Sequence, residues 1–507
     1  MNTSFRDIKL TTFMLSLLFS LWAIMTDDVI NYDGIFYIET ARYIYEGEWL
    51  AAYKNYHWPF YPLLIAAVSK AGSLSLETSA YIINITLLAF IPYIFISLLI
   101  EMGASRKVCI SGALLLLLHV SLNDYRDYII RDFGYWLFFL VSVLQLMRYQ
   151  STGRLRFAVG WNISILIATL FRIEGIVFWV FAPVIFLFTG DDIRNRIKTY
   201  FTLNSALFIS MVFALAYIWI SGFSETLMFS RIAEPYYGIQ SVIVSFVETI
   251  PHKAQQVSDA VLNQFSDKYA VHVVWAALFV IFAFTIIGAT GILALILSIY
   301  AILKIRIRMM YTHRSILFGM IAINILIFSV FVVTQFFLSG RYVMPLALLL
   351  MLPAAFALYA LYTWLNSLSG KKGKIRVFGK SILLLVFLSM LIDGLVSFGS
   401  SKDYIKSTGK WMETNIPHDA KIYSNVPQIY YYSGRWVNQE AVNHARSAIV
   451  KNMFNIDMIR QYDYVSLKFS RKQSSQFENF QKIINKEPVF RDSNSRNDII
   501  LIYRINS

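Results

Sequence analysis

Long uncharged runs alternate with short polar stretches along the first 400 residues of the chain. A helix needs about 20 apolar residues to cross the hydrocarbon core of a bilayer, and runs such as residues 8–25 and 78–100 have that length. Residues 157–171 and 175–189 form a hairpin that only Arg172-Ile173-Glu174 interrupts. The uncharged run 269–303 is too short for two crossings with a turn, so we predict one long or tilted helix there. The pattern predicts an α-helical polytopic membrane protein with about eleven transmembrane helices.

The chain between the first two spans has a different pattern. From about residue 32 to residue 56 it is polar and aromatic, and Tyr37, Ala41 and Ile44 recur at helical spacing. This pattern predicts an amphipathic helix along the membrane surface. The apolar run 63–69 is too short to span, so we predict a re-entrant or interfacial segment.

The composition changes to that of a soluble domain near residue 399. Segments 421–425, 464–467 and 499–503 have the pattern of strands, and segments 405–415 and 447–461 have that of helices. We therefore predict two domains. Residues 1–398 form the transmembrane domain, with outer-face loops at 27–77, 119–132 and 222–268, and residues 399–507 form a small α/β domain outside the membrane.

Charge sets the expected orientation. The chain has a formal net charge of +14, but its basic residues cluster at every second junction between apolar runs, which favours membrane anchoring and argues against nucleic acid as a partner. The positive-inside rule places these junctions and the N-terminus in the cytoplasm, and an odd number of spans places the C-terminal domain on the other side. No small-residue cleavage site follows the first apolar run, so the first helix is predicted to be retained.

Acidic residues gather at the junctions predicted to lie outside. Asp27, Asp28 and Asp33 fall within seven residues, and such groups are costly at a membrane edge unless they face water or a polar cleft. We interpret Asp27 and Asp28 as a solvated helix end, whereas Asp33 either caps the next helix or belongs to a site. In the second outer junction, Arg131 and Asp132 form either a structural ion pair or part of a site.

The other charged residues at these junctions have simple structural explanations. These are mutual pairing of Arg172 and Glu174 at a tight turn, interfacial anchoring by Arg341, and solvation of Asp124 and Asp127 or their pairing with Arg126.

Taken in order, the outer-face motifs resemble those of the GT-C glycosyltransferases, in the branch that holds protein O-mannosyltransferases and the lipid A aminoarabinose transferase. Asp33-Gly34-Ile35-Phe36-Tyr37 resembles the Asp-containing, Tyr-rich helix of their first outer loop. His57-Trp58-Pro59-Phe60-Tyr61-Pro62 resembles the motif that follows, with His57 where Lys is frequent and Trp58 in place of a proline. Arg131-Asp132, the Arg172 turn and Arg341-Tyr342-Val343-Met344-Pro345 resemble later motifs. The resemblance covers about residues 10–400.

The resemblance implies a sugar donor carried on a polyprenyl phosphate, so the absence of a nucleotide-binding loop is expected. Direct displacement needs a base near the acceptor hydroxyl and cations near the leaving phosphate. Asp33 is the candidate base, and Asp132 is a candidate for orienting the acceptor or supporting Asp33. The candidates for binding the donor phosphate or the substrate are Arg131, Arg172, Arg341, His57, Tyr37, Trp58 and Tyr342.

The sequence therefore predicts a membrane glycosyltransferase, with lipid A or lipopolysaccharide, another cell-surface glycan or a protein as the acceptor. The single Cys109 excludes an intrachain disulfide, and this fits a bacterial inner membrane. A divalent cation is compatible with paired acids, but no His or Cys ligand spacing supports one. The alternatives are a transporter or flippase for a lipid-linked sugar, which should show acids near mid-membrane or an inverted repeat, and a non-catalytic assembly protein.

Overall fold

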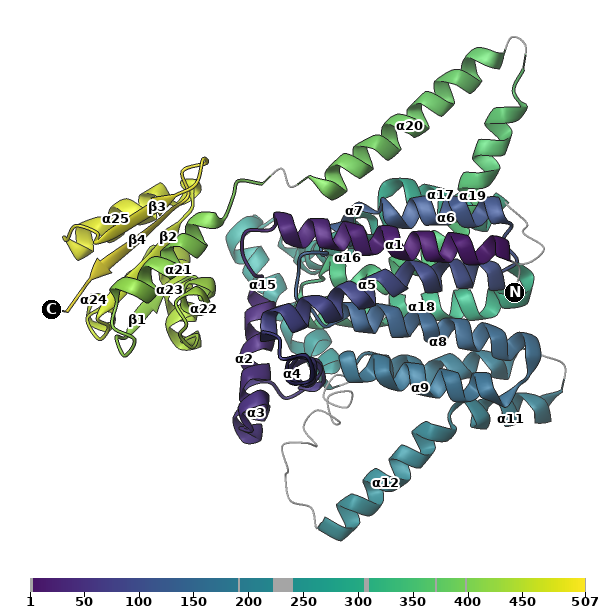
Figure 1. The fold of residues 1–507 in the computed structure, drawn as a ribbon, viewed down its shortest axis with the longest axis horizontal. Coiled ribbons are helices and arrows are strands. Elements are labelled where there is room, and N and C mark those ends of the chain that lie inside the picture. The colour runs from purple at the N-terminus through teal and green to yellow at the C-terminus, as the bar shows by residue number, and fades with distance from the viewer. Residues whose placement is uncertain are drawn as a thin grey trace.

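A helical body and a smaller C-terminal domain make up the protein (Figure 1). The computed structural model describes residues 3–189, 192–221, 240–304, 310–369, 372–396 and 399–506. In these ranges all four strands lie in the C-terminal domain, and the rest of the chain is helical or irregular. The predicted fold class, a polytopic helical protein with a small C-terminal α/β domain, is confirmed.

The body is built mainly from long apolar helices that run side by side, together with shorter helices (Figure 1). Their bounds are α1 (Thr3–Thr26), α5 (Leu76–Glu101), α6 (Arg106–Leu117), α7 (Val120–Asn123), α8 (Asp132–Thr152), α9 (Leu155–Phe171), α10 (Gly175–Phe181) with the 3-10 turn η1 (Ala182–Phe188), α11 (Ile193–Leu203), α12 (Ser205–Ser221), α16 (Ala270–Thr290), α17 (Ile292–Lys304), α18 (Met310–Gln335), α19 (Gly340–Ser367) and α20 (Gly373–Leu395). Six helices of the described chain are long and apolar enough to cross a membrane, and shorter apolar helices accompany them. The chain is thus an integral membrane protein, while the total of eleven spans stays a prediction.

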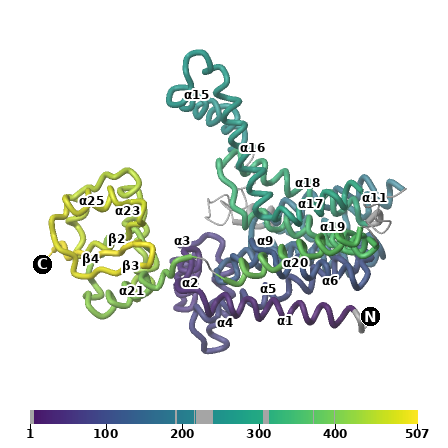
Figure 2. The backbone as a smooth tube through the Cα atoms, turned by 90° about the horizontal axis from the view of Figure 1, so that it is seen from above, coloured from purple at the N-terminus to yellow at the C-terminus, as the bar shows by residue number. Residues whose placement is uncertain are grey.

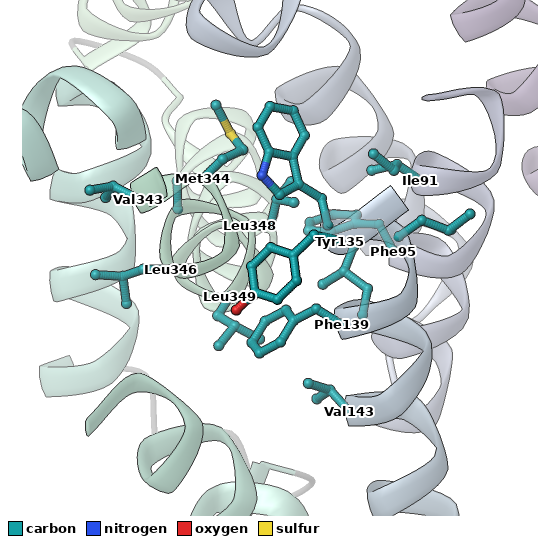
Figure 3. Packing of buried hydrophobic residues seen from close by; sticks show 14 of the residues in the cluster. Ile91, Phe95, Tyr135, Phe139, Val143, Val343, Met344, Leu346, Leu348 and Leu349 are labelled. Carbon is teal, nitrogen blue, oxygen red and sulfur yellow. The ribbon is translucent and has the colours of Figure 1, made fainter. Parts of the chain in front are cut away.

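The core of the body is centred on α19, which packs against α6, α16 and α17. Its buried face meets aromatic residues of α8, among them Tyr135 and Phe139, and α5 contributes Ile91 and Phe95 beside them (Figure 3). Burial of such side chains removes apolar surface from water or lipid and holds the first residues of α8 and α19 at one end of the bundle. By contrast, α20 has no buried residue and leans away from the bundle (Figure 1).

Three short helices lie across this end of the bundle: α2 (Tyr32–Glu46), α3 (Trp49–Asn55) and α4 (Phe60–Gly72) (Figure 1). The helical spacing of Tyr37, Ala41 and Ile44 is confirmed, because all three are buried on the inner face of α2. The run 63–69 belongs to α4, whose 13 residues are too few to span a bilayer, as predicted.

The prediction of one long helix over 269–303 is wrong. The chain breaks at Gly291 into α16 and α17, and Gly291 has φ of 77° and ψ of 137°. A side chain is strongly disfavoured in this backbone region, so the glycine allows an abrupt change of direction inside an uncharged run. Hydrophobicity alone carries no sign of such a break.

We expect Gly291→Ala to destabilise the protein by about 1–3 kcal/mol, the cost of a non-glycine residue in this region. The added Cβ would meet no atom closer than 3.9 Å, so the effect is conformational and not steric. Gly288→Ala is the matched control, because Gly288 lies inside α16 with open space around its Cα and Ala is the better helix former. Thermal unfolding of both variants in the same detergent would check this, and equal effects would contradict it.

The predicted outer loop 222–268 is described only from residue 240 onward, and residues 222–239 lie outside the described ranges. The described part holds η2 (Ser245–Thr249), α15 (Ile250–Val261) and η3 (Asp267–Tyr269). Helix α15 packs against α16 and projects away from the bundle (Figure 2).

The C-terminal domain is a four-stranded mixed sheet with helices. Its elements are α21 (Asp403–Asn415), β1 (Ile422–Ser424), α22 (Pro427–Tyr432), α23 (Gln439–Lys451), α24 (Ile456–Ile459), β2 (Tyr464–Phe469), η5 (Arg471–Gln473), α25 (Ser474–Ile484), β3 (Phe490–Ser493) and β4 (Ile499–Arg504). The strand order is β1-β2-β4-β3, with β1 parallel to β2 and the other pairs antiparallel. Three strands and the helix at 405–415 were predicted. The segment predicted to be helical at 447–461 is helical only in part, because α23 ends at Lys451 and α24 covers Ile456–Ile459.

This domain is fixed to α2 by specific hydrogen bonds. The backbone N–H of Val437 donates to the Glu39 carboxylate at 2.9 Å, and the backbone N–H of Ile30 donates to the Tyr432 hydroxyl at 2.8 Å. Burial raises the pKa of Glu39, although the Val437 N–H partly offsets this effect. The helix that carries Asp33 is therefore held between the helical body and the C-terminal domain.

Candidate functional site

A polar pocket of about 210 Å³ lies where α2, the start of α8, the α9–α10 turn and the start of α19 meet. Its lining residues are Asp33, Phe36, Tyr37, Tyr56, Arg131, Asp132, Arg172, Arg341 and Tyr342. Segments some 300 residues apart in the sequence thus share one site. With three arginines and two aspartates, the lining has an excess of positive charge.

Local packing fixes the position of Asp33. Asn31 donates to the carbonyl of Ile129 at 3.3 Å and accepts from the Ile129 N–H at 2.7 Å, which ties the start of α2 to the second outer loop. A Cβ on Gly34 would lie 2.9 Å from the Ile129 side chain, so only glycine permits this close approach. Asp33 sits in the first turn of α2 and is not its N-cap, which is Asn31. The N-cap interpretation of Asp33 is therefore wrong.

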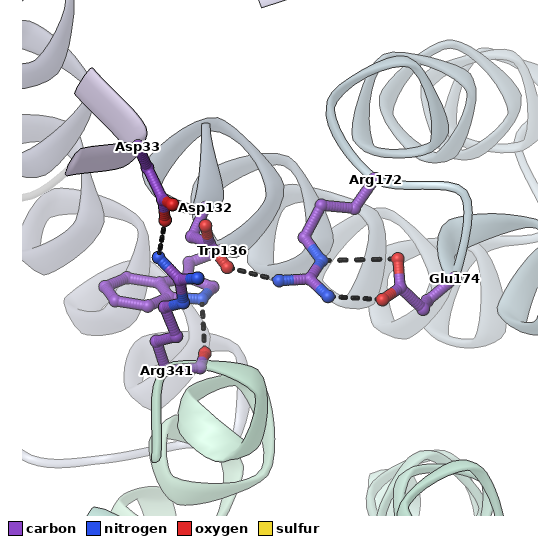
Figure 4. Close-up of polar contacts among 6 residues, drawn as sticks. All are labelled: Asp33, Asp132, Trp136, Arg172, Glu174 and Arg341. Carbon is purple, nitrogen blue, oxygen red and sulfur yellow. Dashed lines mark hydrogen bonds and ion pairs between the residues drawn. The ribbon is translucent and has the colours of Figure 1, made fainter. Parts of the chain in front are cut away.

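Asp33 forms an ion pair with Arg341 (Figure 4). Both side chains keep contact with solvent, with 32% of Asp33 and 24% of Arg341 exposed. The indole N–H of Trp136 donates to the carbonyl of Arg341 at 3.2 Å and fixes the backbone at the start of α19 (Figure 4). The pair is accessible enough to exchange partners when an anion enters.

Asp132 and Glu174 both bind Arg172, and this cluster is more deeply buried (Figure 4). The Nε of Arg172 donates to one Glu174 oxygen at 3.2 Å and an Nη group binds the other, so the contact is bidentate. Burial acts to raise the pKa of Glu174, but the Arg172 guanidinium outweighs it and holds that pKa at about 2. Arg172 also lies over the Tyr342 ring at 4.1 Å. Mutual pairing of Arg172 with Glu174 is thus real, and it extends to Asp132.

Arg131 differs from the other two arginines of the pocket. Among the described residues no carboxylate lies within ion-pair distance of its guanidinium, which is held over the Tyr56 ring at 5.5 Å. The suggested Arg131–Asp132 ion pair is therefore not formed, because Asp132 pairs with Arg172 instead. Arg131 is a cation available to a ligand.

Seven of the nine predicted site residues line the pocket, and two lie elsewhere. His57 packs edge-on to Tyr53, and the Trp58 indole donates to the carbonyl of Leu170 at 2.6 Å. Phe36 and Tyr56 line the pocket and were not predicted to, although Phe36 stands inside the Asp33 motif. Tyr56 carries no distinguishing signal in a chain with 31 tyrosines.

A second group of acids, Asp27, Asp28, Asp124 and Asp127, lines a separate cleft with Lys402. Burial, then the charge of Asp27, raises the pKa of Asp127 to about 7. The alternative in which Asp124 and Asp127 pair with Arg126 is wrong, because Arg126 donates to Ser16, Ser20 and Asn123. Within the described ranges no group of three His, Cys, Asp or Glu side chains has the geometry of a metal site.

The chemistry of the pocket follows from its charges. The partly exposed carboxylate of Asp33 can accept a proton from a hydroxyl. Arg131, which forms no ion pair with a described carboxylate, can bind a phosphate through two parallel hydrogen bonds. Aromatic rings of Phe36, Tyr37, Tyr56 and Tyr342 complete the wall and can contact a sugar face or an isoprenoid. The arrangement is suited to group transfer from a phosphate-linked donor.

Comparison with known proteins identifies a similar fold. The Archaeoglobus fulgidus oligosaccharyltransferase, solved with a tethered acceptor peptide containing the NVT sequon, matches with a TM-score of 0.54 and 12% sequence identity over 90% of this chain and 68% of its own. ArnT from Cupriavidus metallidurans matches in its apo state (TM-score 0.48, 9% identity) and bound to undecaprenyl phosphate (0.47, 10%), each over 98% of this chain and 97% of its own. No protein-family model and no curated protein sequence matches. The first likeness confirms the predicted GT-C-like fold.

Proposed function

We propose that this GT-C-like protein is a membrane glycosyltransferase that moves a sugar from a polyprenyl-phosphate donor to an acceptor outside the cytoplasm, with the pocket around Asp33 as its active site. One observation carries the proposal: a half-exposed carboxylate and an unpaired arginine share a pocket at the end of a bundle of membrane helices. The fold of a solved oligosaccharyltransferase supports it. A cytoplasmic N-terminus is part of the proposal and rests on the charge pattern. A bacterial inner membrane is also part of it and rests on the presence of a single cysteine.

In this mechanism the donor phosphate binds Arg131 and draws Arg341 away from Asp33. The freed Asp33 carboxylate accepts the proton of the acceptor hydroxyl while the oxygen of that hydroxyl attacks the anomeric carbon. The bond from the anomeric carbon to the phosphate oxygen breaks, and the arginines stabilise the negative charge of the departing lipid phosphate. A single displacement of this kind inverts the anomeric centre.

Asp132 and Arg172 position the groups that take part in this reaction. Asp132 neutralises Arg172 and keeps it in place under Tyr342, which makes both positioning residues in this proposal. A small cavity of about 20 Å³ lies beside Arg172 and Tyr342, with Phe178, Phe328 and Phe331 of α10 and α18 in its lining.

We expect Arg131→Gln to weaken the binding of undecaprenyl phosphate by the full-length protein in nanodiscs roughly tenfold or more, the effect of losing one charge-assisted contact. Lys70→Gln is the matched control, because Lys70 is an exposed cation in the last turn of α4, away from the pocket. The affinity can be followed by quenching of tryptophan fluorescence. An Arg131→Gln variant that binds the lipid phosphate as well as the control would remove Arg131 from the donor site.

A further inference from the structure

A cavity of about 490 Å³ lies in the C-terminal domain, separate from the Asp33 pocket. It opens where the parallel strands β1 and β2 begin, next to the loop that joins α22 to α23. Its polar lining includes His418, Lys421, Arg435, Asn438 and Gln461, with Tyr430 and Tyr462 beside them. The mechanism proposed above uses none of these residues.

Arg435 is the central observation. It is 93% buried, its relative exposure being 7%, yet within the described chain no carboxylate forms an ion pair with it. Three of its five N–H groups donate to the carbonyls of Ser433, Ile416 and Pro417. Its Nε has no partner among the described residues. A buried guanidinium with unused donors is costly unless an anion completes it.

Other side chains of the cavity also keep donors available. Lys421 is exposed, and its ammonium forms no ion pair with a described acid. Gln461 is also exposed, and its side-chain amide lies in the lining of the cavity. Asn438 uses its carbonyl oxygen to accept the Ala441 N–H, which leaves its amide N–H groups for a ligand. Cations, amides and tyrosines around one cavity are suited to a polyhydroxylated ligand that carries a negative charge.

The cavity is coupled to the helix that carries the proposed base. Trp436 lines the cavity and stacks on Tyr43 of α2, with ring centroids 4.4 Å apart. The guanidinium of Arg42 lies over the Trp436 ring at 4.3 Å. Tyr43 lies ten residues beyond Asp33 on α2, a rise of about 15 Å along the helix axis.

We propose that this cavity is a second acceptor subsite, which binds an acidic saccharide unit of the acceptor, carrying a carboxylate or a phosphate, while its reacting hydroxyl lies at Asp33. The inference rests on the proposed function and specifies its acceptor as an anionic glycan. Arg435 binds the acidic group, Lys421 adds a second cation, and Asn438 and Gln461 bind sugar hydroxyls.

The test is binding to the full-length protein in nanodiscs, measured by ligand-observed NMR with methyl β-glucuronide, glucose 6-phosphate, methyl β-glucoside and inorganic phosphate. We expect at least one acidic sugar to bind roughly tenfold more tightly than the neutral glucoside, and Lys421→Gln to reduce that preference measurably. The glucuronide and the phosphosugar show whether the acidic group is a carboxylate or a phosphate. Arg435→Lys should act in the same direction, and Lys421→Gln serves where Arg435→Lys fails to fold.

Lys482→Gln is the control, because Lys482 is an exposed cation of α25 outside the cavity. Equal binding of acidic and neutral sugars, inorganic phosphate binding as tightly as the phosphosugar, or equal behaviour of Lys421→Gln and Lys482→Gln would each overturn the inference. The measurement needs no donor lipid. Failure here together with intact sugar transfer would reject the subsite alone, whereas binding without any transfer would reject the proposed function.

Discussion

Asp33→Asn should lower the rate of sugar transfer by about 10²–10⁴-fold, the usual contribution of a general base. The amide has almost the shape of the carboxylate but cannot take the proton of the acceptor hydroxyl. Stability should change little, by about 0–1 kcal/mol, because the Asp33–Arg341 pair is partly exposed to solvent. Transfer from a labelled polyprenyl-phosphate sugar and thermal unfolding would be measured on the same preparation.

Asp28→Asn provides the control for Asp33→Asn. Asp28 is also an acid at this end of the bundle, but it accepts hydrogen bonds from Ser401 and from the backbone N–H of Lys402, outside the pocket. It should keep transfer close to the wild-type rate. Transfer retained by Asp33→Asn would exclude Asp33 as the base and leave Asp132 to be tested next.

Arg172→Ala should have the largest effect on stability, about 3–5 kcal/mol, which is typical when one partner is removed from a buried ion pair. Asp132 and Glu174 would both lose their cation in a place where Arg172 is only 5% exposed. Asp132 is almost fully buried, so water cannot readily replace the guanidinium beside it, whereas Glu174 keeps 27% of its side chain exposed. The loss should appear as a lower midpoint of thermal unfolding in detergent.

Glu174→Gln separates this effect from a general sensitivity of the turn. In that variant Arg172 keeps Asp132 as its partner, so the destabilisation should be clearly smaller than for Arg172→Ala. If Arg172→Ala and Glu174→Gln are both as stable as the wild-type protein, the buried pairs contribute little to the stability of the fold. A large loss of transfer by Glu174→Gln at unchanged stability would instead make Arg172 a direct contact of the donor.

The sequence predicted the fold class and most of the lining of the pocket, because spans, charge alternation and short motifs are local signals. The length of apolar runs indicates membrane helices, and acids at their ends indicate polar sites. Four charged residues of the pocket come from junctions that were predicted to lie on the same side of the membrane, and they do come together: Asp33, Asp132, Arg172 and Arg341. Their catalytic roles stay predictions.

What the sequence could not show is which charges pair. Arg131 adjoins Asp132 in the chain, yet Asp132 pairs with Arg172, forty positions away, and Arg131 lies over the Tyr56 ring. Pairing of this kind depends on how α8 and α9 pack and not on spacing along the chain. The break at Gly291 and the short strand β3 were missed for a similar reason, since one glycine or four residues alter a hydrophobic pattern very little.

Sugar transfer from a lipid phosphate can be measured on the purified protein. The purified protein would be placed in liposomes with an undecaprenyl-phosphate sugar labelled in the sugar, together with a bacterial envelope extract that supplies lipid, glycan and protein acceptors. The account predicts label on an acceptor, matched by release of free undecaprenyl phosphate. Label that crosses the bilayer while still attached to its lipid would contradict it and identify a flippase.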